Sequence, residues 1–287
     1  MIKSILVPFG GGGSDTTAFS SAVALGRRFG AHLDFYHVNI SAGEAAVSTP
    51  GAGFAVGDGL REMLSALQSQ AEARSALARK HFENLCTAEH IRRVDTPALS
   101  GEMSAAWVED NDHAQARLLA RSRCRDLVVV ARPHVGDGVP RDLLEVLVMG
   151  CGRPVIVVPD NSTLPAPETI LVCWKDCAEA ARAAGAALPL LRHARRVVIA
   201  SIEEGAPAAG LADFTRQLAW HGIAADVLAL PRPQTPVSEA LISAARHVGA
   251  DLMVMGAYRR SPLREVVFGG VTQDVLDKCD IGVLLSH

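Results

Sequence analysis

The sequence predicts an α/β protein built from two tandem, doubly wound parallel-sheet domains. The main observation is an internal repeat, because three segments of the first half recur in the same order in the second half. The pairs are SILVPF (4–9) with TILVCW (169–174), DLVVVA (126–131) with DLMVMG (251–256), and CGRPVIVVP (151–159) with CDIGVLLSH (279–287). The proline-rich stretch PDNSTLPAPET (159–169) predicts a linker, since proline continues neither a helix nor a central strand. We therefore place the domains at residues 1–160 and 161–287.

The second half alternates short apolar runs with helical patterns. Continuous apolar runs are typical of strands in a parallel sheet that is covered on both faces. Leu241, Ala245 and Val248 share one helical face, and Ser238 is the expected N-cap of that helix. The resulting βαβαβαβαβ pattern predicts strands at residues 170–174, 197–202, 226–230, 252–255 and 282–285.

The first half carries an insertion around residues 41–86. The interval from Ile5 to Asp126 is about 40 residues longer than the matching interval from Ile170 to Asp251. A Gly/Ala/Ser-rich stretch occupies residues 41–59, and a long helical pattern follows at residues 60–86. A flexible lid and an elaborated loop without a ligand role both remain open.

Composition excludes several classes of protein. The chain has 28 Lys and Arg against 31 Asp and Glu, with 5% aromatic residues, which disfavours a nucleic-acid partner. Its apolar runs are too short to span a membrane, and the start MIKSILVPF is too short for a secretion signal, so we expect a cytoplasmic location. The spacing of the six cysteines favours reduced thiols over a disulfide or zinc framework.

The loop GAYRRSPLREVVFGGVTQDVL (256–276) is the richest candidate for a ligand site. Ligands of open α/β sheets bind at the carboxyl ends of the strands, where this loop begins. Gly256 ends an apolar strand, and Gly269 and Gly270 precede a helix whose N-terminus would attract an anion. Thr272 could cap that helix or donate its hydroxyl to a phosphate, and Arg259 adds positive charge.

This loop resembles the nucleotide signature of the universal stress protein family, Gly-x2-Gly-x9-Gly-Ser/Thr. Gly256 and Gly269 match its first and last glycines, whereas Arg259 replaces the second glycine and Gly270 replaces Ser or Thr. The similarity extends over both halves, including ILVP (5–8) and GRPVIVVP (152–159). It implies a tandem universal stress protein, with the related adenine nucleotide alpha hydrolase-like fold.

The resemblance further implies ATP, with or without Mg²⁺, as the ligand of the second half. The Asp that holds adenosine in ATP-binding members is replaced by Gly10 in the first half and by Lys175 in the second. Transferred position by position, the second-half site comprises Cys173, Trp174, Lys175, Ile202, Met255, Gly256, Arg259, Gly269, Gly270, Val271 and Thr272. We expect Trp174 to border the pocket, and Trp107 and Trp220 to lie in helices at the core or an interface.

The equivalent loop of the first half, ARPHVGDGVPRDLLEV (131–146), predicts no triphosphate site. Ala131 stands for Gly256, and Arg141 and Asp142 stand for Gly269 and Gly270. Asp142 can cap the following helix and so supply the negative charge that a phosphate would bring.

The four glycines in VPFGGGGSDT (7–16) also resemble the SGGxDS loop of the PP-loop ATP pyrophosphatases, which would make the protein an adenylating enzyme. The competing interpretation, which we favour, is a strand-to-helix turn with Ser14 or Asp15 as N-cap and a helix at residues 18–28. His37, after an apolar run, is expected to be a packed histidine at a strand end.

No catalytic triad or dyad and no metal site can be assembled from spacing, so we expect at most slow ATP hydrolysis. The first hypothesis is a stress-response regulatory module that binds ATP or a related adenine nucleotide. The alternative is an interaction or scaffold protein that binds no nucleotide. Family resemblance also implies an internal pseudo-dimer through the last strands, at residues 155–158 and 283–285, and leaves a homodimer open.

Overall fold

A computed structural model describes residues 1–10, 13–38, 58–96, 101–110, 114–133, 141–160, 164–203, 208–257 and 270–287. The insertion before residue 58 and the loop at residues 258–269 lie outside these ranges, together with Gly11 and Gly12. The first half comprises β1 (Ser4–Phe9), α1 (Asp15–Phe29), β2 (His32–Val38), α3 (Asp58–Ala88), β3 (Arg92–Arg93), β4 (Ser104–Asp110), α4 (Ala114–Arg123), β5 (Leu127–Ala131), α5 (Arg141–Gly150) and β6 (Val155–Val158). The second comprises β7 (Thr169–Trp174), α6 (Ala178–Leu191), β8 (Arg196–Glu203), α7 (Leu211–Trp220), β9 (Ala225–Pro231), α8 (Val237–Val248), β10 (Leu252–Gly256), α9 (Gly270–Lys278) and β11 (Gly282–Ser286).

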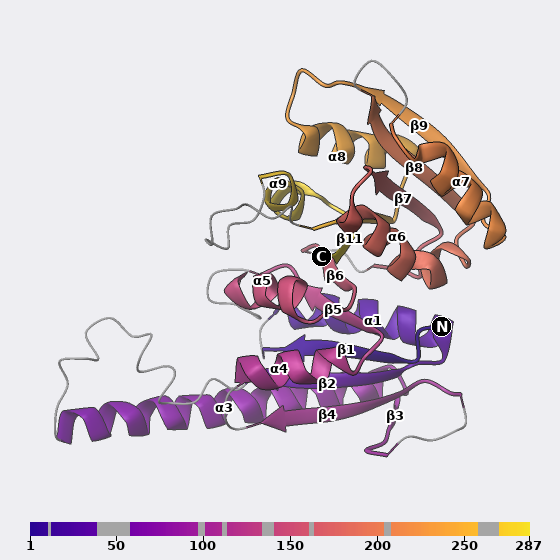
Figure 1. Cartoon of the computed structure of the whole chain (residues 1–287). Helices are drawn as coiled ribbons and strands as arrows, with labels where there is room; N and C mark the ends of the chain where they lie inside the picture. Colours follow the sequence, from indigo (N-terminus) through magenta and orange to yellow (C-terminus); the bar gives the residue numbers. More distant parts are fainter. Residues whose placement is uncertain are drawn as a thin grey trace.

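All strands of the described residues join one sheet in the order β3-β4-β2-β1-β5-β6-β11-β10-β7-β8-β9. Neighbouring strands are parallel except β6 and β11, which pair antiparallel with Val157 opposite Val283 and Val155 opposite Leu285. Figure 1 shows the two halves on either side of this seam, with the C-terminus beside it. The predicted pairing of the last strands within one chain is therefore confirmed.

Helices cover both faces of the sheet, as a doubly wound fold requires. On one face, apolar side chains of α1, α3, α6 and α7 pack on the strands, and on the other face those of α4, α5, α8 and α9 do so. The predicted α/β class with a tandem arrangement is confirmed, and each predicted strand of the second half agrees with an observed one to within two residues.

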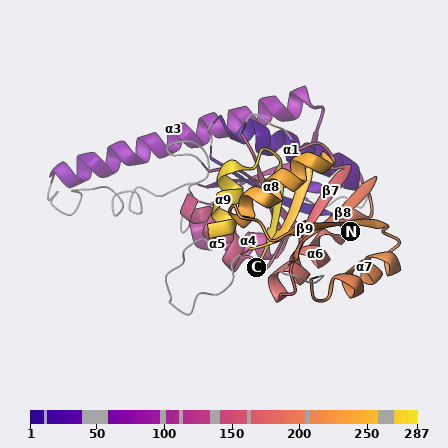
Figure 2. The same cartoon turned by 90° about the horizontal axis from the view of Figure 1, so that it is seen from above.

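The helical pattern at residues 60–86 corresponds to α3, which Figures 1 and 2 show running well past the end of the sheet. Its C-terminal part is fixed to the core by Ala78, Phe82 and Cys86, which are buried. Phe82 contacts the rings of Phe35 and Trp107.

The two tryptophan predictions are borne out in part. Trp107 lies in β4 rather than in the predicted helix, but its ring packs against the core in an aromatic cluster with Phe9 and Phe82. Trp220 lies in a helix as predicted, at the end of α7, but is 85% exposed, so it is not in the core and its place at an interface stays a prediction. His37 is buried at the end of β2 as predicted, and burial lowers its pKa despite a hydrogen bond to the Phe9 carbonyl oxygen.

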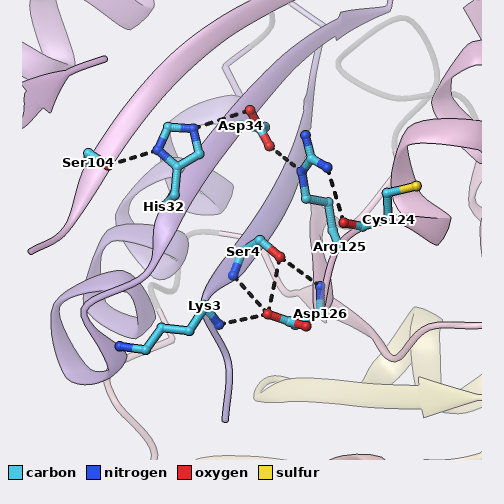
Figure 3. Close-up of polar contacts among 8 residues, drawn as sticks. All are labelled: Lys3, Ser4, His32, Asp34, Ser104, Cys124, Arg125 and Asp126. Carbon is cyan, nitrogen blue, oxygen red and sulfur yellow. Dashed lines mark hydrogen bonds and ion pairs between the residues drawn. The ribbon is translucent and has the colours of Figure 1, made fainter. Parts of the chain in front are cut away.

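The repeated Asp of DLVVVA and DLMVMG has a structural role in both halves. The Asp126 carboxylate accepts hydrogen bonds from the backbone N–H groups of Lys3 and Ser4, at 2.8 and 3.0 Å (Figure 3). The Asp251 carboxylate does the same for Glu168 and Thr169, at 2.9 and 2.8 Å. The Asp126 carboxylate thus fastens the start of β1 to the start of β5, and the Asp251 carboxylate fastens the start of β7 to the start of β10.

A buried carboxylate organises the outer strands of the first half. Asp34 on β2 is 5% exposed and contacts the Arg125 guanidinium and, at 3.4 Å, the His32 ring (Figure 3). The other ring nitrogen of His32 lies 2.8 Å from the Ser104 hydroxyl on β4. Burial raises the pKa of Asp34, but the hydrogen bonds and charges of His32 and Arg125 outweigh burial, so the pKa lies below its ordinary value.

We expect Asp34→Asn to lower the free energy of unfolding by roughly 3 kcal/mol, because it leaves the Arg125 guanidinium without its anion. A depressed carboxylate pKa stabilises the fold above the pKa of the unfolded chain, and this contribution is lost as the pH falls through the folded-state pKa. Urea unfolding from about pH 6 to pH 3 should therefore show a smaller acid loss in the variant than in wild type. Asp226→Asn is the control, because its pair with Arg196 is exposed and contributes less than about 1 kcal/mol. If Asp34→Asn and Asp226→Asn lowered the free energy of unfolding by the same amount, the buried-pair account would be contradicted.

Candidate functional site

A cavity of about 680 Å³ opens at the carboxyl ends of β7, β8 and β10. Its wall also includes the first residues of α6, α8 and α9. This is the edge of an open α/β sheet at which ligands bind, because helix N-termini and strand ends converge there. The volume lies within the range of small-molecule sites.

Nine of the eleven residues predicted for the second-half site line this cavity. They are Cys173, Trp174, Lys175, Ile202, Met255, Gly256, Gly270, Val271 and Thr272. The other two, Arg259 and Gly269, lie outside the described residues. The cavity therefore brings together residues from β7, β8, β10 and α9, and their role as ligand contacts stays a prediction.

The turn from β7 into α6 forms one side of the cavity. Cys177 is the N-cap of α6, and its backbone N–H donates to the Lys175 carbonyl oxygen at 2.8 Å. The Glu179 carboxylate accepts a hydrogen bond from its own backbone N–H and another from the Cys177 thiol, and these bonds hold its pKa below the usual range. A carboxylate of the chain thus already occupies part of the α6 N-terminus.

Trp174 is held rigidly where β7 ends. Its ring stacks on Phe214 of α7, with centroids 4.1 Å apart and planes 8° from parallel. Its indole N–H donates to the Ala209 carbonyl oxygen at 3.2 Å. An oriented aromatic ring at the cavity wall offers a flat apolar surface to a ligand.

Gly256 is the position where β10 approaches α6 most closely. A Cβ atom at residue 256 would lie 2.6 Å from the Glu179 carbonyl carbon and 2.7 Å from the Ala180 nitrogen. These are backbone atoms of the first turn of α6, which cannot swing away as a flexible side chain could. The glycine is therefore required for the spacing between the strand and the helix that border the cavity.

The start of α9 forms the opposite side. Gly270 is the first residue of the helix, so its backbone N–H has no partner within the helix. Thr272 is the third residue of the helix, so the first of its two predicted roles, as the cap, is wrong; it lines the cavity, and its predicted role as a phosphate donor stays a prediction. The Ser238 prediction is wrong as well: Pro236 is the N-cap of α8, and the Ser238 hydroxyl bonds to the Asp274 carboxylate of α9 at 2.9 Å.

Comparison with known proteins identifies the fold. The model of the universal stress protein family matches residues 233–287, the segment that contains α8, β10, α9 and β11. The chain has a universal stress protein fold. No curated protein matches the sequence at a significant level.

Solved structures extend the match over both halves. A universal stress protein from Archaeoglobus fulgidus DSM 4304 superposes with a TM-score of 0.66 at 12% identity, covering 99% of this chain and 95% of that chain. A functionally unknown protein from Pseudomonas aeruginosa PAO1 gives 0.56 at 15% identity, with 99% and 92% coverage. A putative universal stress protein from Pseudomonas aeruginosa UCBPP-PA14 gives 0.55 at 15% identity, with 99% and 93% coverage. The family resemblance found in the sequence is thus confirmed for the final segment, and the tandem universal stress protein fold is confirmed for the whole chain.

In the first copy of the universal stress protein fold, buried aromatic side chains lie at the matching strand ends. Strand registers place Phe9 opposite His37 just as they place Trp174 opposite Ser201, and they make Tyr36 the counterpart of cavity-lining Ala200. Phe9 and Tyr36 are fully buried. Burial and the neighbouring Asp110 carboxylate raise the Tyr36 pKa, so the ring stays a neutral phenol. Tyr36 thus places a larger side chain where the second copy has Ala200, whereas Phe9 is smaller than its counterpart Trp174.

The glycine-rich turn after β1 also has an internal anion. The Gly10 backbone N–H donates to the Asp15 carboxylate at 3.1 Å, and Asp15 is 1% exposed. The helix α1 begins at Asp15 with Ser14 as N-cap, in agreement with the turn predicted for this stretch. Asp142, by contrast, is the second residue of α5 rather than its cap, although its charge still lies in the first turn.

Sequence reasoning missed the other residues of the cavity wall. Asp176, Cys177, Glu179 and Ala180 follow the predicted strand 170–174 directly, so the rule that ligands bind after strand ends could have found them. Ala257 follows the predicted strand 252–255 within the loop 256–276, so the same rule could have found it. The remaining wall residues depend on how distant segments pack; they are Ala200, Ala208, Ala209, Val237 and Leu241.

The Cys173 thiol of the cavity wall is poorly suited to nucleophilic chemistry. Burial raises the pKa of Cys173 to about 12, so its thiol is neutral near pH 7. Among the described residues there is no group of three or more His, Cys, Asp or Glu side chains that could hold a metal ion.

We expect Gly256→Ala to destabilise the protein by about 1–3 kcal/mol, because its methyl group would press on the α6 backbone. Gly185→Ala is the matched control within α6, since a Cβ there has no heavy atom of another segment within 4 Å. That substitution should be neutral or stabilise by about 0.5–1 kcal/mol. Urea unfolding measures both, and a Gly256→Ala protein as stable as wild type would refute the close-approach argument.

Proposed function

We propose that this protein is a stress-response regulatory module whose C-terminal half binds ATP or a related adenine nucleotide. The observation that carries the proposal is the single cavity lined by Trp174, Gly256, Gly270 and six other residues that the nucleotide resemblance had named. Binding as a regulatory ligand is favoured over turnover, because burial keeps the Cys173 thiol of the cavity wall neutral and so a poor nucleophile.

The chemistry of the wall supports a ligand with an apolar ring system and an anionic end. Trp174, Ala200, Ile202, Leu241 and Met255 offer an apolar surface suited to an adenosine moiety. The N-terminus of α9, with exposed Gly270 at its start, offers backbone N–H groups without intrahelical partners and a partial positive charge suited to phosphate oxygens.

Charged side chains of the cavity wall affect where the phosphates of a nucleotide would bind. Lys175 stands where ATP-binding relatives carry an Asp, and its ammonium group would attract phosphate rather than a ribose hydroxyl. Asp176 and Glu179 bring negative charge to the α6 side. We therefore infer that phosphates face α9 and that a divalent cation such as Mg²⁺ would reduce repulsion from the α6 carboxylates.

The alternative is an interaction or scaffold protein that binds no nucleotide. The substitutions at Gly10, Lys175 and Arg259 favour it, since each departs from the family's nucleotide pattern. The PP-loop enzyme is disfavoured by the Asp15 carboxylate, which already takes the Gly10 amide that a phosphate would need. No helix within the described ranges is long and apolar enough to span a bilayer. A cytoplasmic location and association of two chains are part of the proposal.

We expect purified, nucleotide-stripped protein to release heat when titrated with ATP, ADP or AMP, and Gly270→Asp to weaken binding roughly tenfold or more. The substitution places at the α9 N-terminus the carboxylate that Asp142 brings to α5, so phosphate is repelled while the helix is stabilised.

Gly270→Ala is the control for size without charge, because a Cβ at this position has open space around it. It should bind nucleotide nearly as wild type does. If the wild-type protein gives no heat with any of the three nucleotides at millimolar concentration, the scaffold alternative holds instead. A native mass spectrum of the expressed protein would report copurified nucleotide and the assembly state together.

A further inference from the structure

Arg132 of the first half reaches across the β6–β11 seam to the second half. Its backbone follows β5 and is fixed by a 2.8 Å hydrogen bond from its N–H to the Val158 carbonyl oxygen. Its guanidinium donates to the carbonyl oxygens of Asp277, at 3.3 Å, and Cys279. The Asp160 carboxylate lies 3.8 Å from the same guanidinium, whose side chain is 17% exposed.

These carbonyl oxygens belong to the C-terminal end of α9, where helix carbonyls lack intrahelical partners and carry partial negative charge. A guanidinium with several donors in one plane satisfies two such oxygens at once. The first half therefore caps the helix whose other end, at Gly270, Val271 and Thr272, forms a wall of the cavity.

The corresponding position of the second half makes no such side-chain contact with the first half. The counterpart of Arg132 in the second half is Ala257, whose N–H likewise bonds to the last strand, through Ser286 at 2.9 Å, but whose methyl group cannot donate. The end of α5 is capped within its own half, where Arg123 donates to the Gly150 carbonyl oxygen at 3.2 and 3.1 Å.

A short helix held at its C-terminus acts as a rigid rod. α9 has nine residues and so is only about 13 Å long, and a shift at one end moves the other. Two contacts with α8 also hold the helix: the bond from Ser238 to Asp274, near its middle, and the ion pair of Lys278 with Glu239, at 3.8 Å, at its C-terminal end. Because that ion pair is exposed and therefore weak, loss of the Arg132 contact would let α9 tilt about the Ser238 contact and shift its first turn relative to α6 and α8.

We propose that Arg132 of the first half is a positioning residue that fixes the α9 wall of the cavity in the second half. For its effect on ligand affinity this inference rests on the proposed function. The first half then sets the geometry of the nucleotide site rather than serving only as a structural duplicate.

The experiment compares Arg132→Met, which keeps the length of the stem, with Arg132→Lys, which keeps the charge, in the full chain. Arg123→Met is the matched control, because it removes a helix cap of the same kind from α5. Hydrogen exchange of peptides from α9, α5 and α6 is measured without nucleotide, and ATP affinity is measured by titration. We expect Arg132→Met to speed exchange in α9 while α5 and α6 keep wild-type rates, with partial recovery in Arg132→Lys. ATP affinity should fall roughly fivefold or more in Arg132→Met.

Arg123→Met should speed exchange in α5 and leave α9 and ATP affinity unchanged. Wild-type exchange of α9 in Arg132→Met, or faster exchange of equal size throughout the second half, would overturn the proposal. So would faster α9 exchange with unchanged ATP affinity. If wild-type protein binds no ATP, the proposed function fails separately, and the selective change in α9 exchange still decides whether Arg132 positions this helix.

Discussion

The antiparallel pairing of β6 with β11 is the contact on which the rest of the molecule depends. It merges two parallel sheets into one, and it turns the second half so that the last strand of each copy lies against the other. Buried valines and leucines along these two strands exclude water from the seam. Because the backbones of β6 and β11 are hydrogen-bonded to each other, the two halves cannot move as domains joined only by a linker do. A side chain such as Arg132 can therefore contact the other half in a fixed geometry.

The two copies of the fold differ in the side chains at their strand ends. In the first copy, Phe9, Tyr36 and the aromatic cluster around Trp107 lie at the strand ends, and the Asp15 carboxylate accepts a hydrogen bond from the Gly10 amide. In the second, Ala200 and Gly256 line the cavity. The shared backbone thus carries Tyr36 where the second copy has Ala200, and Ala131 where it has Gly256.

Much of the fold could be predicted from the sequence, because apolar runs and the internal repeat report strand burial locally. The wall of the cavity was predicted as far as it follows strand ends and a family motif, as at Cys173 and Gly256. Ser238 was predicted as a cap, and Thr272 as a cap or a phosphate donor, from local sequence alone, whereas Ser238 bonds to Asp274 of α9 and Thr272 is buried. The helical pattern around Trp107 was misleading because the residue lies in a strand, and the correct helical pattern around Trp220 did not reveal that its side chain is exposed. Val237 and Leu241 reach the cavity only through the tertiary fold.

The paired carboxylates Asp126 and Asp251 stand at the opposite rim of the sheet from the cavity. Each carboxylate joins the starts of two strands through hydrogen bonds to main-chain amides, which do not depend on the side chains at the other ends of those strands. The residues that fix the strand arrangement and the residues that line the cavity therefore lie at opposite ends of the same strands. Substitutions at the cavity end can accumulate in either repeat without changing the strand order.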